Sequence, residues 1–161
     1  MKIYLDDIRI PDDKDWILVT NYDEFVNKVL ELGLKNIEII SLDHDLGDSA
    51  MAEYFRNSKP NGFINYDNIT EKTGFDCAKW LVNHFLDAFP TISHPTMDDL
   101  FIPDPNADVY FPQIYTHSAN TVGSVNITSF INNFLKSQNK TPTCLRVRIP
   151  HTNRDGIVFY P

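Results

Sequence analysis

Hydrophobic and polar positions along the chain predict strands and helices in alternation. Helical spacing of apolar positions predicts three helices, one from Asn21 to Gly33, one over 73–89 ending before Pro90, and one over 127–135 after Gly123. Short apolar runs predict strands at 2–5, 17–20, 37–42, 111–116, 144–149 and 157–160, and residues 9–13 read as a turn. This alternation favours an α/β fold with a mostly parallel sheet.

Polar clusters follow three of the predicted strands directly. The first contains Asp6 and Asp7, and the other two span residues 43–45 and 117–120. In open α/β sheets, ligands bind in the crevice outside the carboxyl ends of the strands. We therefore expect the three clusters to converge on one crevice.

The carboxylates of these clusters have the chemistry of a site for a hard cation. Asp6, Asp7 and Asp43 in one place would repel one another, and their pKa values would rise unless a cation were bound. Oxygen ligands of this kind suit Mg²⁺ or Mn²⁺. The alternative is that some of these aspartates cap loops or helices, as aspartate commonly does.

Two histidines, His44 and His117, stand at strand ends inside the polar clusters. Imidazoles are suited to general acid–base catalysis near neutral pH, so we expect both to be catalytic, with Asp45 beside them. A structural histidine is the alternative for each of them.

Other polar side chains in the clusters could bind a phosphate. Arg9 follows the acidic pair and could neutralise carboxylates or hold a phosphate through two hydrogen bonds. Ser118 and Asn120 offer a hydroxyl and an amide, although they could equally cap the helix that follows. Arg146 and Arg148 lie two residues apart, so on a strand they face the same side and could hold one or two further phosphates.

The charge of the chain limits the kind of partner. A net charge of −8 argues against a protein that coats long nucleic acid, because phosphate contacts dominate such binding. Residues 136–154, however, hold five basic residues and no acidic one. The expected partner is a small nucleotide or a short RNA terminus.

No apolar run is long enough for a membrane span, and the acidic start is not that of a signal peptide. We therefore expect a cytoplasmic protein in which Cys77 and Cys144 are buried free thiols. The length of 161 residues predicts one domain, 1–161, with two insertions at 48–72 and 91–111. Insertions of this length are usually functional loops or disordered, and we expect lids over the crevice.

The motifs together resemble the receiver domains of response regulators, and more specifically the receiver-like family named for cyclic-phosphate processing. The segments that carry the resemblance are Asp6-Asp7-Ile8-Arg9-Ile10-Pro11, Ser41-Leu42-Asp43-His44-Asp45-Leu46-Gly47, Thr73-Gly74-Phe75-Asp76 and His117-Ser118-Ala119-Asn120-Thr121-Val122-Gly123. The resemblance implies a flavodoxin-like, receiver-like three-layer fold with a mostly parallel five-stranded sheet. It further implies Mg²⁺ held by the acidic pair and the third Asp, a hydroxyl residue that meets the phosphoryl group, and a role on cyclic phosphates of nucleotides or RNA ends, as in RNA repair.

The chain departs from ordinary receivers in three respects. The segment between the first two predicted strands is too short for the usual first helix. The usual Lys after the fifth strand is missing, so Arg146 or Arg148 would have to substitute for it. Histidines that flank the acidic residues are also foreign to phospho-relay receivers, which disfavours a signalling receiver that accepts phosphate on Asp43.

The first functional hypothesis is a metal-dependent phosphoesterase, a hydrolase that acts on a cyclic phosphate of a small nucleotide or RNA end. The alternative is a non-catalytic receiver-like module that binds a nucleotide or a partner protein.

Overall fold

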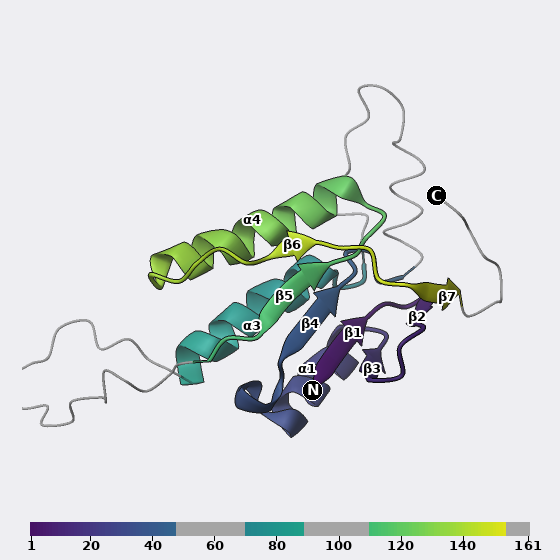
Figure 1. Cartoon of the computed structure of the whole chain (residues 1–161), viewed down its shortest axis with the longest axis horizontal. Coiled ribbons are helices and arrows are strands. Elements are labelled where there is room, and N and C mark those ends of the chain that lie inside the picture. Colours follow the sequence, from purple (N-terminus) through teal and green to yellow (C-terminus); the bar gives the residue numbers. More distant parts are fainter. Residues whose placement is uncertain (48–69, 89–109, 154–161) are drawn as a thin grey trace, which may run out of the picture.

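Five parallel strands form the central sheet of the computed structural model, which describes residues 1–47, 70–88 and 110–153 (Figure 1). Along the sheet the strands follow the order β3 (Trp16–Val19), β1 (Lys2–Leu5), β4 (Ile39–Leu42), β5 (Gln113–Thr116) and β6 (Leu145–Arg146). In flavodoxin-like numbering this is the order 2-1-3-4-5, with the switch in strand order between β1 and β4. The expected receiver-like α/β fold is confirmed.

Three helices follow β3, β4 and β5. They are α1 (Tyr22–Leu32), α3 (Gly74–Ala88) and α4 (Thr121–Ser137), and a short 3₁₀ helix, η1 (Leu34–Asn36), follows α1. The side chain of Asn21 caps α1 by accepting the N–H of Glu24, as the sequence predicts. Helix α4 begins earlier than predicted, because Asn120 caps it by accepting the N–H of Gly123.

The hydrophobic core lies between the sheet and these helices. Every second strand residue, including Ile3, Leu5, Ile40, Leu42 and Ile114, is buried in one cluster with apolar side chains of α1, α3 and α4. Helix α3 packs between α1 and α4, so the three helices form a single layer on this face. Among the described residues no helix covers the opposite face, which carries the alternate strand residues such as Tyr4 and Ser41.

A two-stranded antiparallel ribbon lies beside the main sheet and consists of β2 (Arg9–Pro11) and β7 (His151–Asn153). In register, Arg9 is opposite Asn153. The prediction of a turn at 9–13 was therefore wrong for residues 9–11. Their partner strand lies about 140 residues away in the chain, so no local pattern indicates the pairing.

The remaining predictions concern the last two strands, the two insertions, the cysteines and membrane spans. The strand expected at 144–149 shortens to Leu145–Arg146. The strand expected at 157–160 and most of the two insertions lie outside the described residues. Cys77 and Cys144 are buried free thiols, as expected, and burial raises the pKa of both. Within the described parts of the chain, no helix is long and apolar enough to cross a membrane.

Candidate functional site

The polar clusters after β1, β4 and β5 meet at the carboxyl ends of these strands. Leu5 pairs with Leu42, and Leu42 pairs with Thr116, so the residues that follow them are neighbours. Asp6, Asp43 and His117 therefore converge, as the order of the strands leads one to expect, and the ring of His117 lies 3.1 Å from the carboxylate of Asp6.

Three carboxylates form what we call the acidic centre, namely Asp6, Asp7 and Asp43. One oxygen atom from each lies within 4.8 Å of the other two. Asp6 and Asp43 are buried and Asp7 is half-buried. Three negative charges this close together in a largely buried place require compensation by a cation.

Arg9 supplies part of that compensation. Its Nε lies 2.5 Å from Oδ2 of Asp6, and its Nη2 lies 2.8 Å from Oδ2 of Asp43. Its Nη1 donates a hydrogen bond to the carbonyl oxygen of His117 at 3.1 Å. Of the two roles that the sequence left open for Arg9, neutralising carboxylates is the one seen here.

The carboxylate of Asp6 is fully hydrogen-bonded. Its Oδ1 accepts the backbone N–H groups of Ile8 and Arg9, at 2.9 and 2.6 Å, and its Oδ2 accepts from Arg9 and from Nε2 of His117. Four donors match the number of positions at which a carboxylate accepts hydrogen bonds. Asp6 therefore organises the loop and orients Arg9, and it has no lone pair left for another ligand unless one of these donors leaves.

The surroundings shift the pKa values of the three acidic groups in different directions. Burial alone would raise the pKa of Asp6, but the donors from His117 and Arg9 outweigh it and hold that pKa below its ordinary value. Burial and the charge of Asp6 raise the pKa of Asp43 in spite of Arg9. Burial, with the charges of Asp6 and Asp43, raises the pKa of Asp7 to about 6.

The ring of His117 contacts three described residues, which together fix its position at the acidic centre. Because Asp6 is ionised, Nε2 of His117 donates to it, and in a neutral ring Nδ1 then accepts from the hydroxyl of Ser41 at 2.7 Å. The ring stacks on Tyr4 with centroids 4.1 Å apart. Ser41, His117 and Asp6 thus make the contacts of a Ser-His-Asp triad, but Ser41 is fully buried and cannot act as a nucleophile.

His44 lies on the other side of the sheet, between the first turns of α3 and α4. Its Nδ1 donates to Oδ1 of Asp45 at 2.7 Å, and Nδ2 of Asn120 donates to the same oxygen at 3.1 Å. A Cβ atom at Gly123 would overlap the His44 ring, so the packing of this ring explains why glycine stands there. His44 is 4% exposed.

Ser118 and Arg146 join the site through β5 and β6. The hydroxyl of Ser118 accepts the N–H of Asn120 at 3.1 Å, and Ser118 opposes the rise in the pKa of Asp43. Nη2 of Arg146 donates to the carbonyl oxygen of Ser118 at 3.0 Å. Arg148 is exposed and makes no hydrogen bond or ion pair with any other described residue. Of the two arginines, only Arg146 reaches the site.

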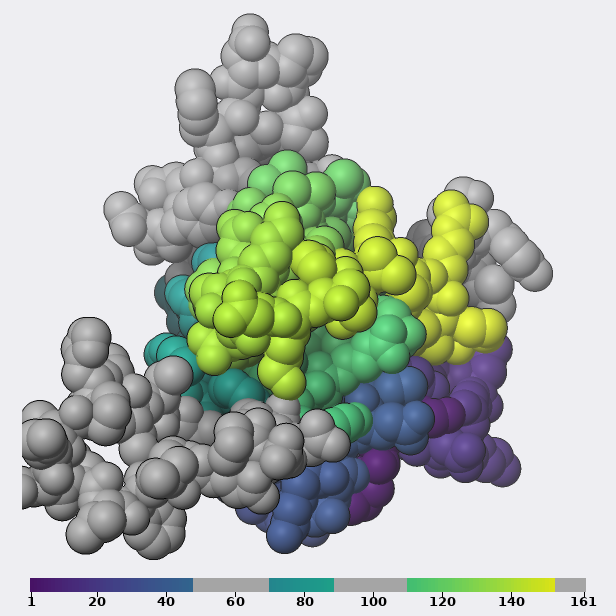
Figure 2. Space-filling view, turned by 60° about the vertical axis from the view of Figure 1, so that its left-hand side comes forward, coloured from purple at the N-terminus to yellow at the C-terminus, as the bar shows by residue number. Residues whose placement is uncertain are grey.

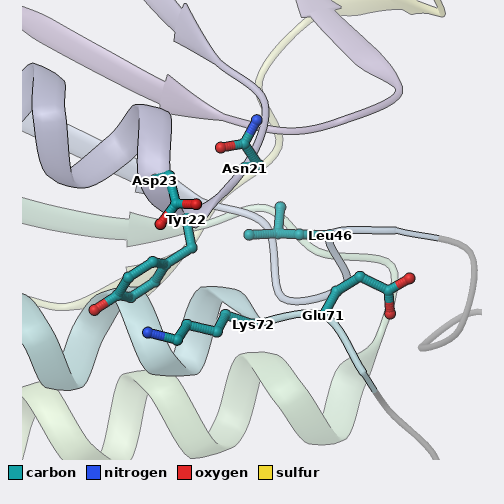
Figure 3. A pocket seen from close by; sticks show the side chains of 6 residues that line it. All are labelled: Asn21, Tyr22, Asp23, Leu46, Glu71 and Lys72. Carbon is teal, nitrogen blue, oxygen red and sulfur yellow. The ribbon is translucent and has the colours of Figure 1, made fainter.

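A cavity of about 260 Å³ opens between the start of α1 and the segments after β4 and before α3, and no carboxylate of the acidic centre is among its lining residues (Figure 3). Leu46 is one of the side chains that line it. The ammonium group of Lys72 lies 3.8 Å from the centre of the Tyr22 ring. Leu46 follows Asp43 by three residues, so the cavity and the acidic centre share the loop after β4. The residues that line it are Asn21, Tyr22, Asp23, Leu46, Glu71 and Lys72.

Sequence reasoning missed two residues that hold the site together, Tyr4 and Ser41. Both lie two positions before an aspartate of the acidic centre, so strand alternation places Tyr4 on the side of Asp6 and Ser41 on the side of Asp43. That periodicity was available in the sequence. The position of the His117 ring relative to Tyr4 and Ser41 could not be predicted, because it depends on the pairing of β4 with β5.

A family model described as the cyclic-phosphate processing receiver domain matches residues 1–98, more than half of the chain. The chain belongs to this family. The match includes β1, β4 and α3 with the whole acidic centre, and it ends before β5, so His117, Ser118 and Arg146 come from a part of the receiver-like fold that the family model does not match. Comparison with the curated proteins found no match, and comparison with the solved structures found none.

Receiver domains often bind Mg²⁺ through acidic residues, and the acidic centre has carboxylate oxygen atoms that could bind such a cation. Oδ1 of Asp7 is buried without a hydrogen-bond partner in the described part of the chain. Asp43 lies beside it, and the carboxylates supply the hard oxygen atoms that Mg²⁺ and Mn²⁺ prefer. The residues therefore fit a divalent cation, with Asp7 and Asp43 better placed to bind it than Asp6.

Proposed function

We propose that this protein is a divalent-cation-dependent phosphoesterase that opens a cyclic phosphate on a small nucleotide or a short RNA end. The observation that carries the proposal is the acidic centre itself, in which three carboxylates lie within 4.8 Å of one another and the buried Oδ1 of Asp7 has no hydrogen-bond partner among the described residues. Membership of the cyclic-phosphate processing family supports the choice of substrate class.

Asp7 and Asp43 would hold Mg²⁺ or Mn²⁺, with Asp6 behind them as the group that orients Arg9. When bound, such a cation supplies Lewis acidity, which stabilises the charge that develops on the phosphate oxygens. Arg9 uses three of its five N–H groups on described residues, so it could donate another to a phosphate that docks there, and Ser118 at the end of β5 would donate its hydroxyl. Arg146, at the carbonyl of Ser118, would hold a further phosphate of the substrate.

The proton-transfer group of this proposal is His44 rather than His117. Both ring nitrogens of His117 are occupied, by Ser41 and Asp6, so this ring orients its neighbours. In His44, Asp45 accepts the Nδ1 proton, so Nε2 is the nitrogen that would take a proton. The two expected catalytic histidines thus receive different roles.

The nucleoside part of the substrate would lie in the cavity beside Leu46. Its volume of about 260 Å³ is below the range typical for drug-sized ligands, so it suits one base or sugar rather than a long strand. A short substrate also agrees with the net charge of −8.

Turnover of 2′,3′-cyclic nucleotides by the purified full-length chain, with Mg²⁺ or Mn²⁺ present, tests the proposal. We expect product formation that EDTA stops, and a loss of at least about 100-fold in kcat for His44→Ala, as is usual when general acid–base catalysis is removed. Asp7→Asn should also lower kcat, because it removes a carboxylate that would hold the cation. Asp15→Asn is the matched control, because Asp15 is exposed and lies in the same acidic stretch of sequence. No turnover of any cyclic phosphate with several divalent cations would overturn the proposal.

A non-catalytic binding module is the second candidate, favoured by the burial of His44, which is 4% exposed. Such a module would bind a cyclic nucleotide without converting it, and His44→Ala would leave its dissociation constant unchanged. Equilibrium binding measured alongside turnover separates the two candidates, because the enzyme variant should keep binding and lose turnover.

A further inference from the structure

The ribbon of β2 and β7 connects the C-terminal part of the described chain to the acidic centre. Arg9 is the first residue of β2, and β7 pairs with β2 along its whole length. Figure 2 shows the yellow C-terminal residues lying against the purple N-terminal ones. Two further hydrogen bonds hold the ribbon, one from Asp12 N–H to the carbonyl of Pro150 at 3.0 Å and one from the Thr152 hydroxyl to Asp12 at 3.0 Å.

Arg9 occupies the acidic centre with all three of its side-chain nitrogens. They contact Asp6, Asp43 and the carbonyl of His117, and the side chain is only 16% exposed. A guanidinium group with three fixed partners is held tightly when its backbone is also fixed. Strand pairing with β7 fixes that backbone.

We propose that the β2–β7 ribbon holds Arg9 in the acidic centre as a tethered cation, which competes with a divalent cation for Asp43. The inference rests on the cation site of the proposed function but does not depend on catalysis. Strand β7 lies outside the part of the chain that the family model matches. In this proposal it positions Arg9 at a site whose three carboxylates all lie in the matched part.

The competition follows from the contacts of Asp43. Its Oδ1 accepts the N–H of His44, and its Oδ2 pairs with Arg9 at 2.8 Å. A divalent cation that binds Asp43 meets both the positive charge of Arg9 and an oxygen that Arg9 already uses. Loosening Arg9 therefore removes a repulsion and frees a ligand atom at the same time.

Mn²⁺ binding to the full-length chain, measured by electron paramagnetic resonance of the free ion, tests the proposal. We expect Arg9→Gln to lower the dissociation constant for Mn²⁺ about tenfold, within the usual range for coupling between two sites. Thr152→Pro removes a backbone N–H from β7, and we expect it to shift the constant in the same direction by a smaller factor. The matched control is Thr152→Ser, which keeps both the backbone N–H and the hydroxyl that bonds Asp12 and should bind Mn²⁺ as the wild type does.

A measurement on the wild type covers the case in which Arg9→Gln does not fold. The Nη–H signals of Arg9, whose Nη2 pairs with Asp43, should lose their protection from exchange in an NMR titration as Mg²⁺ binds. Persistence of that protection at saturating Mg²⁺ would overturn the proposal, and so would an unchanged Mn²⁺ constant in Arg9→Gln or in Thr152→Pro. If no variant binds Mn²⁺, both this inference and the cation part of the proposed function fail. If turnover alone is absent, only the proposed function fails.

Discussion

The imidazole of His117 lies flat on the phenol ring of Tyr4, with the two ring centroids 4.1 Å apart and the planes inclined by 18°. Both rings come from the face of the sheet that no described helix covers, and His117 contacts the carboxylate of Asp6. The stacked pair fixes the ring plane of His117, and Ser41 and Asp6 fix its two nitrogens. The orientation of Asp6, and through it that of Arg9, therefore depends on residues inside the strands.

Replacement of Ser41 by Ala should destabilise the fold. The change leaves Nδ1 of His117 without its partner in a buried place, which costs about 1–3 kcal/mol in the free energy of unfolding. Urea unfolding measures the loss. Ser129→Ala on the exposed side of α4 is the control and should change the free energy of unfolding by less than about 0.5 kcal/mol. Equal stability of Ser41→Ala and wild type would mean that Nδ1 does not depend on Ser41.

Replacement of Gly123 by Ala should destabilise the fold by about 1–3 kcal/mol, because the new methyl group overlaps the ring of His44. The double variant Gly123→Ala with His44→Ala should recover part of this loss, since the ring is then absent. A double-mutant cycle of unfolding free energies measures the coupling. Additive losses would show that the two residues do not contact each other in the folded protein.

The stability of the wild type should depend on pH through Asp7. Its pKa is about 6 in the folded chain and 3.8 when unperturbed, so between these values the folded chain holds a proton that the unfolded chain releases. The free energy of unfolding of the wild type should therefore fall relative to that of Asp7→Asn as the pH rises through this window. Unfolding curves in EDTA from pH 4 to pH 8 measure the difference. Two parallel pH profiles would contradict the raised pKa.

Arg146 should affect the binding of substrates that carry more than one phosphate, and Arg148 should not. Only Arg146 contacts the loop after β5, through the carbonyl of Ser118. We expect Arg146→Ala to raise KM up to about fivefold for a cyclic nucleotide that carries an additional 5′-phosphate, the range for an exposed ion pair. KM for the bare cyclic mononucleotide should stay unchanged.

Arg148→Ala is the internal control for this experiment. It removes the same charge from the same segment without removing a contact of the site. An equal rise in KM for both substrates in Arg146→Ala would mean that Arg146 serves the loop after β5 rather than the additional phosphate.

Much of the main sheet could be predicted from local patterns. The capping box at Asn21 and the apolar spacing behind it indicate α1, and the abrupt change from apolar to acidic residues after Leu5 and Leu42 marks the ends of β1 and β4. These signals are local because helix caps and strand ends are determined by residues close together in the chain. The convergence of Asp6, Asp43 and His117 then follows from the parallel order of the strands.

The partners inside the site could not be predicted in the same way. Arg9 neutralises Asp6 and Asp43, and His117 uses both of its ring nitrogens. Both arrangements depend on distances between strands. The pairing of Arg9–Pro11 with His151–Asn153 has no local signature, since Pro11 and the two acids after it look like a turn when taken alone. Proline is nevertheless acceptable in a strand at the edge of a sheet.

The pairing of β2 with β7 also has a consequence for the order in which the site is assembled. The ribbon joins residues that lie about 140 positions apart, and contacts between such distant positions form late because closing a long loop costs entropy. During synthesis, β1 and β4 can pair long before His151–Asn153 leave the ribosome. In a newly made chain the three carboxylates should therefore meet before β7 exists, and for that interval strand pairing does not yet hold Arg9 beside them.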